Sequence, residues 1–476
     1  MTPFITRIYR LVPLALALIL LLASCAGQPT DVTNVEPHTP CHEPFTPTPP
    51  TISTDDSALY YRALAEAVFE DVAAADADDF TYEGYRDGIR LLSYVGDGGT
   101  VVLPDEIEGK PVVALGDGLF QNNTALTALL IPDSVREIGE HLLTGARFLQ
   151  VLKVPQLSPT RETGASGHLS YFFGGNSPIG TGFRVPSSLD TVILSSAINA
   201  IPDHAFYECA RVRMVFSDAA VDTVGQFAFY GCSQLHTVEL SAGMGSPQSI
   251  GDYAFGNCTS LTYFYQGKSV LGKSVLYGCT GLEHVYLSSM GENIPYLGSL
   301  FGAETHMWNT TYVPKSLARV TVESGNIPDN AFYGCEHLAI VYLPNTAASI
   351  GNRAFYGCTS LQYVTLPDSI MSVGEMAFAH CTTMASVTLS SSLTDLGIQA
   401  FMDCTNLTEI TLPDSLIALP NSAFADCCNL QTVTLGASIA SIGNQSFRNC
   451  VSLTSVTGGK ADMQIGEGND ILTAVR

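Results

Sequence analysis

The sequence predicts a solenoid, in which short structural repeats stack one on the next, rather than a globular enzyme. Six cysteines recur at a constant spacing of 23 residues: Cys335, Cys358, Cys381, Cys404, Cys427 and Cys450. Each lies in a copy of one longer motif, of which residues 350–369 form a clean example. A fixed period of this size is typical of repeat architectures, in which each repeat is one supersecondary unit.

One aromatic position of the motif counts the turns and predicts a right-handed stack of about 14. It holds phenylalanine or, in two turns, leucine: Phe120, Leu143, Phe173, Phe206, Phe229, Phe255, Leu276, Phe301, Phe332, Phe355, Phe378, Phe401, Phe424 and Phe447. The intervals after Leu143, Phe173 and Phe301 are longer than the others. Such insertions map to loops on the outside of a solenoid.

Each turn is expected to contribute one short parallel β-strand, followed by a loop or short-helix return. In the clean copy the strand is Leu361-x-x-Val364-x-Leu366. It is rich in β-forming residues and ends at Pro367, which cannot donate to a strand ladder. Gly351 is expected to bend the chain, because glycine adopts backbone angles that other residues avoid. Stacking buries the apolar residues that one turn alone leaves exposed.

The N-terminus is typical of an exported bacterial lipoprotein. Arg7 and Arg10 precede an apolar run, residues 11–23, that is too short to span a bilayer comfortably. The run ends in Leu22-Ala23-Ser24-Cys25, so residues 1–24 are predicted to be a signal peptide and Cys25 the lipidated first residue of the mature chain. The alternative is an ordinary signal peptide in which Cys25 is incidental.

Four further segments follow the signal peptide. Residues 25–57 are rich in proline and threonine and predict an extended tether. Residues 58–79 predict a small acidic helix, residues 80–457 the solenoid, and residues 458–476 a tail without a clear capping helix. Asp76, Asp78 and Asp79 suggest a calcium site, but their spacing lacks the Gly and distal Glu of a calcium loop. A solvated acidic helix end is the alternative.

Charge and motif content exclude several functions. The net charge of −24 disfavours nucleic acid and anionic membrane surfaces as partners, so contact with a membrane is expected only through the lipid anchor. Gly267 to Ser274 matches the phosphate-loop pattern, but these residues fill an ordinary repeat turn instead of linking a buried strand to a helix. No zinc-binding, serine-hydrolase or other catalytic motif is present, and we expect neither an enzyme, a metal site nor a cofactor.

Ten cysteines are expected to form a structural ladder inside the stack: Cys209, Cys232, Cys258, Cys279, Cys335, Cys358, Cys381, Cys404, Cys427 and Cys450. Export permits disulfides, and neighbouring turns about 4.8 Å apart come close enough for them. However, side chains in a ladder point the same way, and a free thiol packs as a small apolar group. Cys428 lies outside the ladder and is the more reactive candidate.

Strand positions that alternate with the inward residues face the concave side of the stack. Six of them are aromatic and form the candidate ligand-binding set: Tyr263, Tyr265, His284, Tyr286, Tyr342 and Tyr363. An aromatic patch on an extended sheet can stack on sugar rings or anchor a peptide. The alternative is that tyrosine occurs here only because it favours strands.

The motif Ile-Gly-x-x-Ala-Phe-x-Gly-Cys-x-x-Leu-x-x-Val-x-Leu-Pro resembles the BspA-like leucine-rich repeat family over about residues 80–457. Departures occur at Asn123, Ala146, Asn176 and Glu304, which take the cysteine position. The resemblance implies a leucine-rich repeat solenoid on a bacterial cell surface that binds host or microbial proteins or glycans. We therefore expect a non-catalytic, lipid-anchored adhesion or binding protein; a spacer protein of the envelope without a specific ligand is the alternative.

Overall fold

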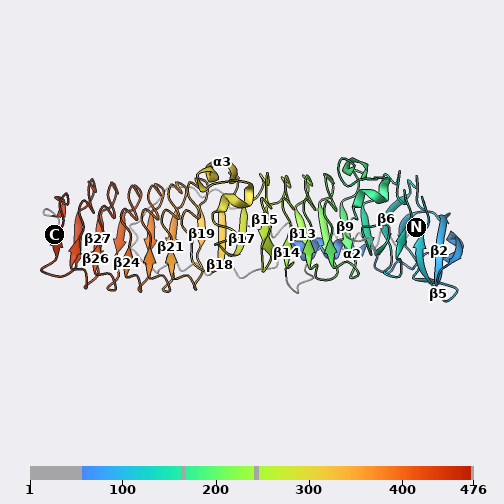
Figure 1. Ribbon diagram of the computed structural model, residues 1–476, viewed down its shortest axis with the longest axis horizontal. Helices are drawn as coiled ribbons and strands as arrows, with labels where there is room; N and C mark the ends of the chain where they lie inside the picture. The colour runs from blue at the N-terminus through green and yellow to red at the C-terminus, as the bar shows by residue number, and fades with distance from the viewer. Residues whose placement is uncertain (1–55, 162–166, 241–245, 473–476) are drawn as a thin grey trace, which may run out of the picture. The chain divides into compact units, whose positions relative to one another are not determined.

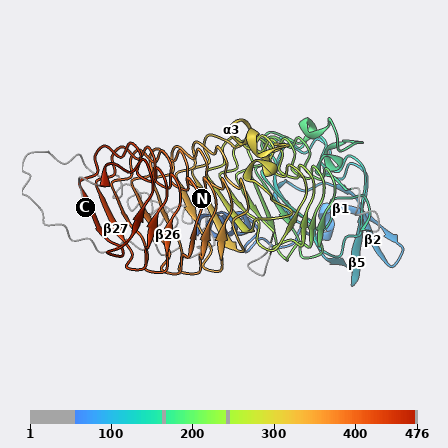
Figure 2. The same cartoon turned by 60° about the vertical axis from the view of Figure 1, so that its left-hand side comes forward.

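The structure, a computed structural model, describes residues 56–161, 167–240 and 246–472. These residues form a stack of turns that lie side by side along one long axis, as Figures 1 and 2 show. The predicted solenoid is therefore confirmed. The predicted signal peptide, Cys25 and nearly all of the predicted tether lie outside the described residues.

The first strand of each turn belongs to a row of parallel strands that runs along the stack, here called the first ladder, which hydrogen bonding divides into four sheets. Neighbouring strands pair in register, for example Val364 with Val387 in the next turn. The fourteen predicted aromatic positions separate the fifteen strands that the described residues place in this ladder. These are β3 (Gly99–Val102), β6 (Leu126–Leu130), β8 (Val151–Val154), β9 (Thr191–Leu194), β11 (Met214–Ser217), β13 (Thr237–Glu239), β15 (Tyr263–Tyr265), β17 (His284–Ser289), β18 (Arg319–Ser324), β19 (Ile340–Tyr342), β21 (Tyr363–Thr365), β23 (Ser386–Thr388), β25 (Glu409–Thr411), β27 (Thr432–Leu435) and β29 (Ser455–Gly458).

A second parallel ladder corrects the expectation of one strand per turn. Its strands are mostly two residues long, and they pair in parallel with the equivalent residues of an adjacent turn, as Ile350 does with Val373. They are β5 (Lys110–Leu115), β7 (Glu137–Ile138), β10 (Ala200–Ile201), β12 (Thr223–Val224), β14 (Ser249–Ile250), β16 (Val270–Leu271), β20 (Ser349–Ile350), β22 (Ser372–Val373), β24 (Asp395–Leu396), β26 (Ala418–Leu419), β28 (Ser441–Ile442) and β30 (Gln464–Ile465).

The phenylalanines of successive turns form a buried stack through the interior. The rings of Phe355 and Phe378 lie 4.9 Å apart and within 3° of parallel, and those of Phe378 and Phe401 lie 5.2 Å apart and within 2°. All three side chains are fully buried. Burying a side chain of this size contributes about 1.5–3 kcal/mol. Repetition of the same position in every turn therefore builds one continuous core.

The glycine that follows most second-ladder strands is required for close packing, which corrects the expected role of Gly351; Pro202 and Pro420 follow β10 and β26 instead. A methyl group on Gly351 would lie 2.4 Å from the backbone nitrogen of Asp329, and one on Gly374 would lie 2.6 Å from that of Asn352. Neither glycine has a positive φ. The left-handed conformation occurs instead two residues later, at Arg353 (φ 53°). Consecutive turns thus touch backbone to backbone at the glycine.

Both ends of the described stack continue the repeat pattern with modifications. At the N-terminal end, β1 (Phe80–Tyr85) pairs antiparallel with β2 (Gly88–Tyr94), β2 pairs parallel with β5, and β4 (Glu106–Ile107) pairs antiparallel with β5. At the other end, the solenoid continues beyond residue 457, where we expected it to stop. β30 joins the second ladder, and Asn469 accepts a hydrogen bond from the Phe447 amide at 3.0 Å.

Two insertions project from the stack on the same side in Figure 1. The first contains the 3-10 helices η3 (Leu169–Phe173) and η4 (Gly182–Arg184). The second contains η5 (Leu297–Phe301), η6 (His306–Trp308) and the short helix α3 (Asn309–Tyr312). Both fall at the long intervals between predicted aromatic positions, where loops on the outside were expected.

The acidic segment before the solenoid forms a helix, α2, over Asp56–Ala67, which is shorter than the predicted 58–79. The 3-10 helix η1 (Ala77–Asp79) follows and leads directly into β1. No helix among the described residues is both long and apolar enough to cross a bilayer.

Replacing Gly374 with alanine tests the backbone contact between turns. Because the added methyl group would lie 2.6 Å from the Asn352 nitrogen, we expect Gly374→Ala to lower the free energy of unfolding by about 1–3 kcal/mol. Denaturant titration measures this change. The control is Gly84→Ala in β1, where nothing lies within 4 Å of the new methyl group. Equal effects of the two substitutions would contradict the packing role of Gly374.

Candidate functional site

Four of the six predicted ligand-binding residues meet on the outward side of β15 and β17. The ladder register pairs Tyr263 with His284 and Tyr265 with Tyr286, and Phe264 between the tyrosines points into the core. Tyr263 and Tyr265 are 41% and 42% exposed, which leaves their ring surfaces open to a ligand. We call Tyr263, Tyr265, His284 and Tyr286 the aromatic cluster.

The rings of the aromatic cluster contact one another across the two strands. Tyr263 and His284 form an edge-to-face pair with ring centroids 5.5 Å apart. Tyr265 and Tyr286 lie 5.1 Å apart at 49°, and His284 lies 6.4 Å from Tyr286. Pairs of this kind contribute about 0.5–1.5 kcal/mol beyond the area they bury. The strand register therefore holds the four rings in a defined arrangement before any ligand binds.

The environment of the cluster favours the neutral forms of His284 and Tyr286. Burial lowers the pKa of His284, and the nearby charge of Arg319 lowers it further. The His284 Nε2 atom lies 3.0 Å from the Thr321 hydroxyl oxygen. Burial, together with a hydrogen bond to Glu323, raises the pKa of Tyr286 to about 12. The cluster consequently offers aromatic faces and neutral hydrogen-bonding groups rather than a catalytic acid or base.

Tyr342 and Tyr363 stand apart from the cluster. Tyr286 of β17 pairs with Thr321 of β18, and Thr321 pairs in turn with Tyr342 of β19, so Thr321 lies between the two tyrosines. His284 of β17 pairs with Arg319 of β18. Tyr342 and Tyr363 are both half-buried, and neither has a ring contact with the cluster within the described chain. The register therefore brings four of the six predicted residues together and places Tyr342 and Tyr363 apart from them. The strand that follows the second insertion, β18, places Arg319 and Thr321 between the aromatic cluster and Tyr342.

On the N-terminal side of the cluster, the same face of the first ladder is covered by the segment that contains α2. Ala65, Val68 and Phe69 pack on the outward apolar side chains of four strands: Ala128, Val151, Ile193, Met214 and Phe216. Figure 1 shows α2 lying beside β9 and β13. Sequence reasoning missed this contact, although the outward positions of these strands, which are apolar except for Lys153 and Thr191, were the available signal.

Arg62 fastens α2 to the strand ends. Its guanidinium group donates hydrogen bonds to the Ser217 carbonyl oxygen at 3.0 Å, to Asp218 at 3.3 Å and to Glu239 at 3.5 Å. The ring of the preceding residue, Tyr61, lies 5.9 Å from the ring of His236, which comes immediately before β13. The covered part of the face thus extends to β13, and the aromatic cluster begins on the next strand of the ladder.

Substitution of Arg62 tests whether these contacts hold α2 in place. Arg62→Ala removes the three contacts that join Arg62 to the ends of the strands. We expect residues 56–79 to detach from the strands about fivefold more often as a result. Limited proteolysis should then cleave this segment faster. Arg353→Ala is the control, because Arg353 and its partner Glu375 are each half exposed and 4.0 Å apart. Unchanged cleavage in the Arg62 variant would contradict the anchoring role.

The ten ladder cysteines lie buried in the interior, and all the described cysteines are free. Most of these thiols donate a hydrogen bond to the phenylalanine carbonyl of the preceding turn, as Cys232 does to Phe206 at 3.0 Å and Cys381 does to Phe355 at 3.2 Å. Burial raises the pKa of Cys279 and Cys358 to about 12. These thiols stay protonated at neutral pH and are poor nucleophiles. Cys428, by contrast, is half-buried.

A second set of aromatic residues, which sequence reasoning missed, lies along the outside of the turns. His204, Phe227 and Tyr253 stack in a row with centroids 5.2 Å apart at each step, and Phe227 and Tyr253 are within 1° of parallel. All three have positive φ angles, between 53° and 59°. The signal was available, because each residue occupies the same motif position in successive turns. The three side chains are half-buried, and their rings stack on one another.

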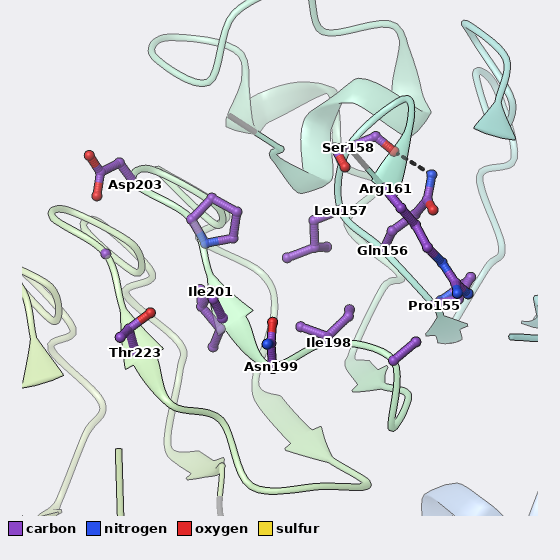
Figure 3. A pocket seen from close by; sticks show the side chains of 14 residues that line it. Pro155, Gln156, Leu157, Ser158, Arg161, Ile198, Asn199, Ile201, Asp203 and Thr223 are labelled. Atoms are coloured by element: carbon purple, nitrogen blue, oxygen red, sulfur yellow. Dashed lines mark hydrogen bonds between the residues drawn. The ribbon is translucent and has the colours of Figure 1, made fainter. Parts of the chain in front are cut away.

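A cavity of about 540 Å³ opens where the first insertion interrupts the second ladder. Figure 3 shows Arg161 and Asp203, its charged lining residues, on opposite sides. Ser158 donates its hydroxyl hydrogen to the Thr160 carbonyl oxygen at 2.6 Å, so it is not paired with a base. Gln156 donates to the Ser158 carbonyl, and its own side-chain oxygen is buried without a partner. Among the described residues that line the cavity, no nucleophile is paired with a base as catalysis requires.

Two patterns considered in the sequence occupy ordinary structural positions. Val270 and Leu271 of the phosphate-loop match form β16, and no helix follows them to aim amides at a phosphate. Asp78 and Asp79 lie in η1, and the described residues contain no cluster of three or more side chains that could hold a metal ion.

The sequence profile of the BspA-type leucine-rich repeat region matches residues 106–163, 181–306 and 325–454 in six copies. This match covers more than half of the chain. The protein belongs to the BspA-type leucine-rich repeat family. A search of curated proteins finds no match to the sequence.

Several solved structures are similar to this BspA-type chain. A leucine-rich cell surface protein from Faecalibacterium prausnitzii is 18% identical, with 85% of this chain and 98% of that chain covered and a TM-score of 0.24. A leucine-rich repeat protein from Bacteroides ovatus is 18% identical over 81% and 94%, with a TM-score of 0.29. The pneumococcal vaccine antigen PcpA is 15% identical over 85% and 96%, with a TM-score of 0.25.

Proposed function

We propose that this chain is a non-catalytic binding protein of the bacterial cell surface that recognises a protein or glycan through the aromatic cluster. The single observation that carries the proposal is the exposure of Tyr263 and Tyr265 on a face that is otherwise covered by α2 or lined mainly by small polar residues. Exposed aromatic groups that are held rigidly tend to supply most of the binding energy at protein surfaces.

The face around the cluster supports binding rather than a purely structural role. Toward the C-terminal end, the outward strand positions carry mostly threonine, serine and glutamate, as at Thr388, Glu409 and Thr432. The N-terminal part is already buried under α2. An incoming ligand therefore meets the aromatic rings as the main apolar surface on this face, with the His284 ring and the tyrosine hydroxyls beside them for hydrogen bonds.

We further propose that the protein is exported and held at the envelope by a lipid on Cys25, with the proline- and threonine-rich segment as a tether. The sequence of the N-terminus supports this part of the proposal. A tether would hold the solenoid away from the membrane. The aromatic cluster would then be available to host or microbial partners.

The double substitution Tyr263→Ala with Tyr265→Ala tests the binding surface. Screening of the purified protein on glycan arrays and immobilised host matrix proteins identifies the ligand to use. We expect the double variant to bind that ligand about tenfold more weakly or worse, because it loses both exposed rings. Thermal unfolding should change little, since both side chains are substantially exposed.

The matched control replaces Thr432 and Thr434, which hold the corresponding outward positions on β27, with alanine. These substitutions should leave binding unchanged. Full binding by the tyrosine variant would contradict the assignment of the surface. Flat results across every glycan and protein panel would favour the alternative of an envelope spacer.

A further inference from the structure

The second insertion carries Trp308, the chain's single tryptophan, on its outer surface. Trp308 is 44% exposed and its neighbour Met307 is 64% exposed, whereas the aromatic rings of the repeat core are almost all fully buried. Large apolar side chains that gather on a protruding surface commonly mark an interaction site. This surface lies on the insertion, not on β15 and β17, so it is separate from the aromatic cluster.

The insertion holds the Trp308 ring in a fixed position. Trp308 stacks on Tyr312 with ring centroids 6.0 Å apart and planes within 16°, and Tyr312 packs against the core. Asn309 between them is fully buried. Its side-chain oxygen accepts the Gly298 amide at 3.0 Å, and its side-chain nitrogen donates to the Tyr333 carbonyl oxygen at 2.8 Å. The two rings therefore form a preorganised platform of offset, stacked rings, which lowers the entropic cost of binding.

A small cavity with both polar and apolar lining residues adjoins this platform. Its volume is about 190 Å³, and it lies between α3 and the turn at Gly278–Thr280. Tyr312 and Lys315 line it, together with the threonines Thr280, Thr310 and Thr311. The three threonines are exposed, and the described residues offer their hydroxyl groups no hydrogen-bond partner. Because ligand pockets usually measure about 300–1,000 Å³, this cavity suits part of one small ring rather than a whole large ligand.

Lys315 supplies a positive charge at the edge of the cavity. Its side chain is exposed and has no acidic partner within 4 Å among the described residues. The Ser316 hydroxyl group contacts the Thr280 and Leu282 carbonyl oxygens at 2.8 and 2.7 Å, which fixes the backbone beside Lys315. In a chain with a net charge of −24, an unpaired lysine next to an aromatic platform favours an anionic ligand.

We propose that the second insertion binds a carboxylated pyranose, a sugar ring of the uronic acid type. The apolar face of the sugar would pack on the exposed rim of the stacked Trp308 and Tyr312 rings, its hydroxyl groups would bond the threonines, and its carboxylate would meet Lys315. A neutral sugar would leave Lys315 unused. An acidic peptide would leave the threonine hydroxyls largely unused, so the combination of groups favours the sugar acid.

Because Trp308 is the single tryptophan, intrinsic fluorescence of the full-length protein reports on this site directly. Methyl β-glucuronide and methyl β-glucoside are the probes, since they differ only in the carboxylate at C6. We expect the glucuronide to change the emission saturably and to protect Trp308 from acrylamide quenching. The glucoside should bind about tenfold more weakly, the factor expected for one charge-assisted contact.

Two variants separate this site from a general effect of charge. Lys315→Gln should remove the preference for the glucuronide, whereas Lys110→Gln, an exposed lysine on β5, should leave it unchanged. Tyr312→Ala should weaken binding of both sugars while keeping the fluorophore. The proposal is overturned if the glucuronide causes no saturable change up to its solubility limit, or if both sugars bind equally well to the unaltered protein. Either result leaves the separate proposal for Tyr263 and Tyr265 intact.

Discussion

The close approach of consecutive turns at the glycine column is the constraint on which the rest of the structure depends. At Gly351, Gly374 and their equivalents, a single added methyl group would enter the backbone of the preceding turn. This contact sets the distance at which the second-ladder strands pair, the phenylalanine rings stack and the cysteine thiols reach the carbonyl groups of the preceding turn. None of these interactions is strong alone. Their repetition in one register makes a chain with little regular helix into a single continuous core.

The same register divides the outer face of the first ladder into parts with different chemistry. Strands β6 to β11 present apolar side chains that α2 and Phe69 cover, whereas β15 and β17 present the exposed aromatic cluster, and the later strands present mostly threonine, serine and glutamate. Arg62 and Tyr61 place the end of the covered part at β13. The insertion that holds Trp308 adds a second exposed aromatic surface outside the ladder. Uniform repeats thus carry distinct surfaces because their outward residues are free to vary while their inward residues are not.

The periodic part of the fold could be predicted from the sequence, since the spacing of Cys335 to Cys450 and of the phenylalanines determines which residues face inward. Features that depend on contacts between distant segments could not. Val68 and Phe69 meet Ile193 and Phe216 only after folding, and no local pattern links them. The two-residue strands have no signature of their own because their partners lie a full turn away. The role of Gly351 was misjudged because sequence shows that glycine is required but not whether the reason is a backbone angle or a neighbouring chain. Tyr342 was grouped with the cluster for a similar reason: the insertion places Thr321 between it and Tyr286.

Oxidative footprinting of the full-length protein by mass spectrometry tests most directly whether this register governs the surface. Hydroxyl radicals should modify Tyr263, Tyr265 and Met371 quickly, because these side chains are between 41% and 52% exposed. Met214 should react as slowly as the fully buried Met384, because α2 and Phe69 cover it. If Met214 reacts as fast as Met371, or if Tyr263 and Tyr265 are protected to the same degree as Phe378, then the division of the face into a covered part and an open aromatic part is wrong.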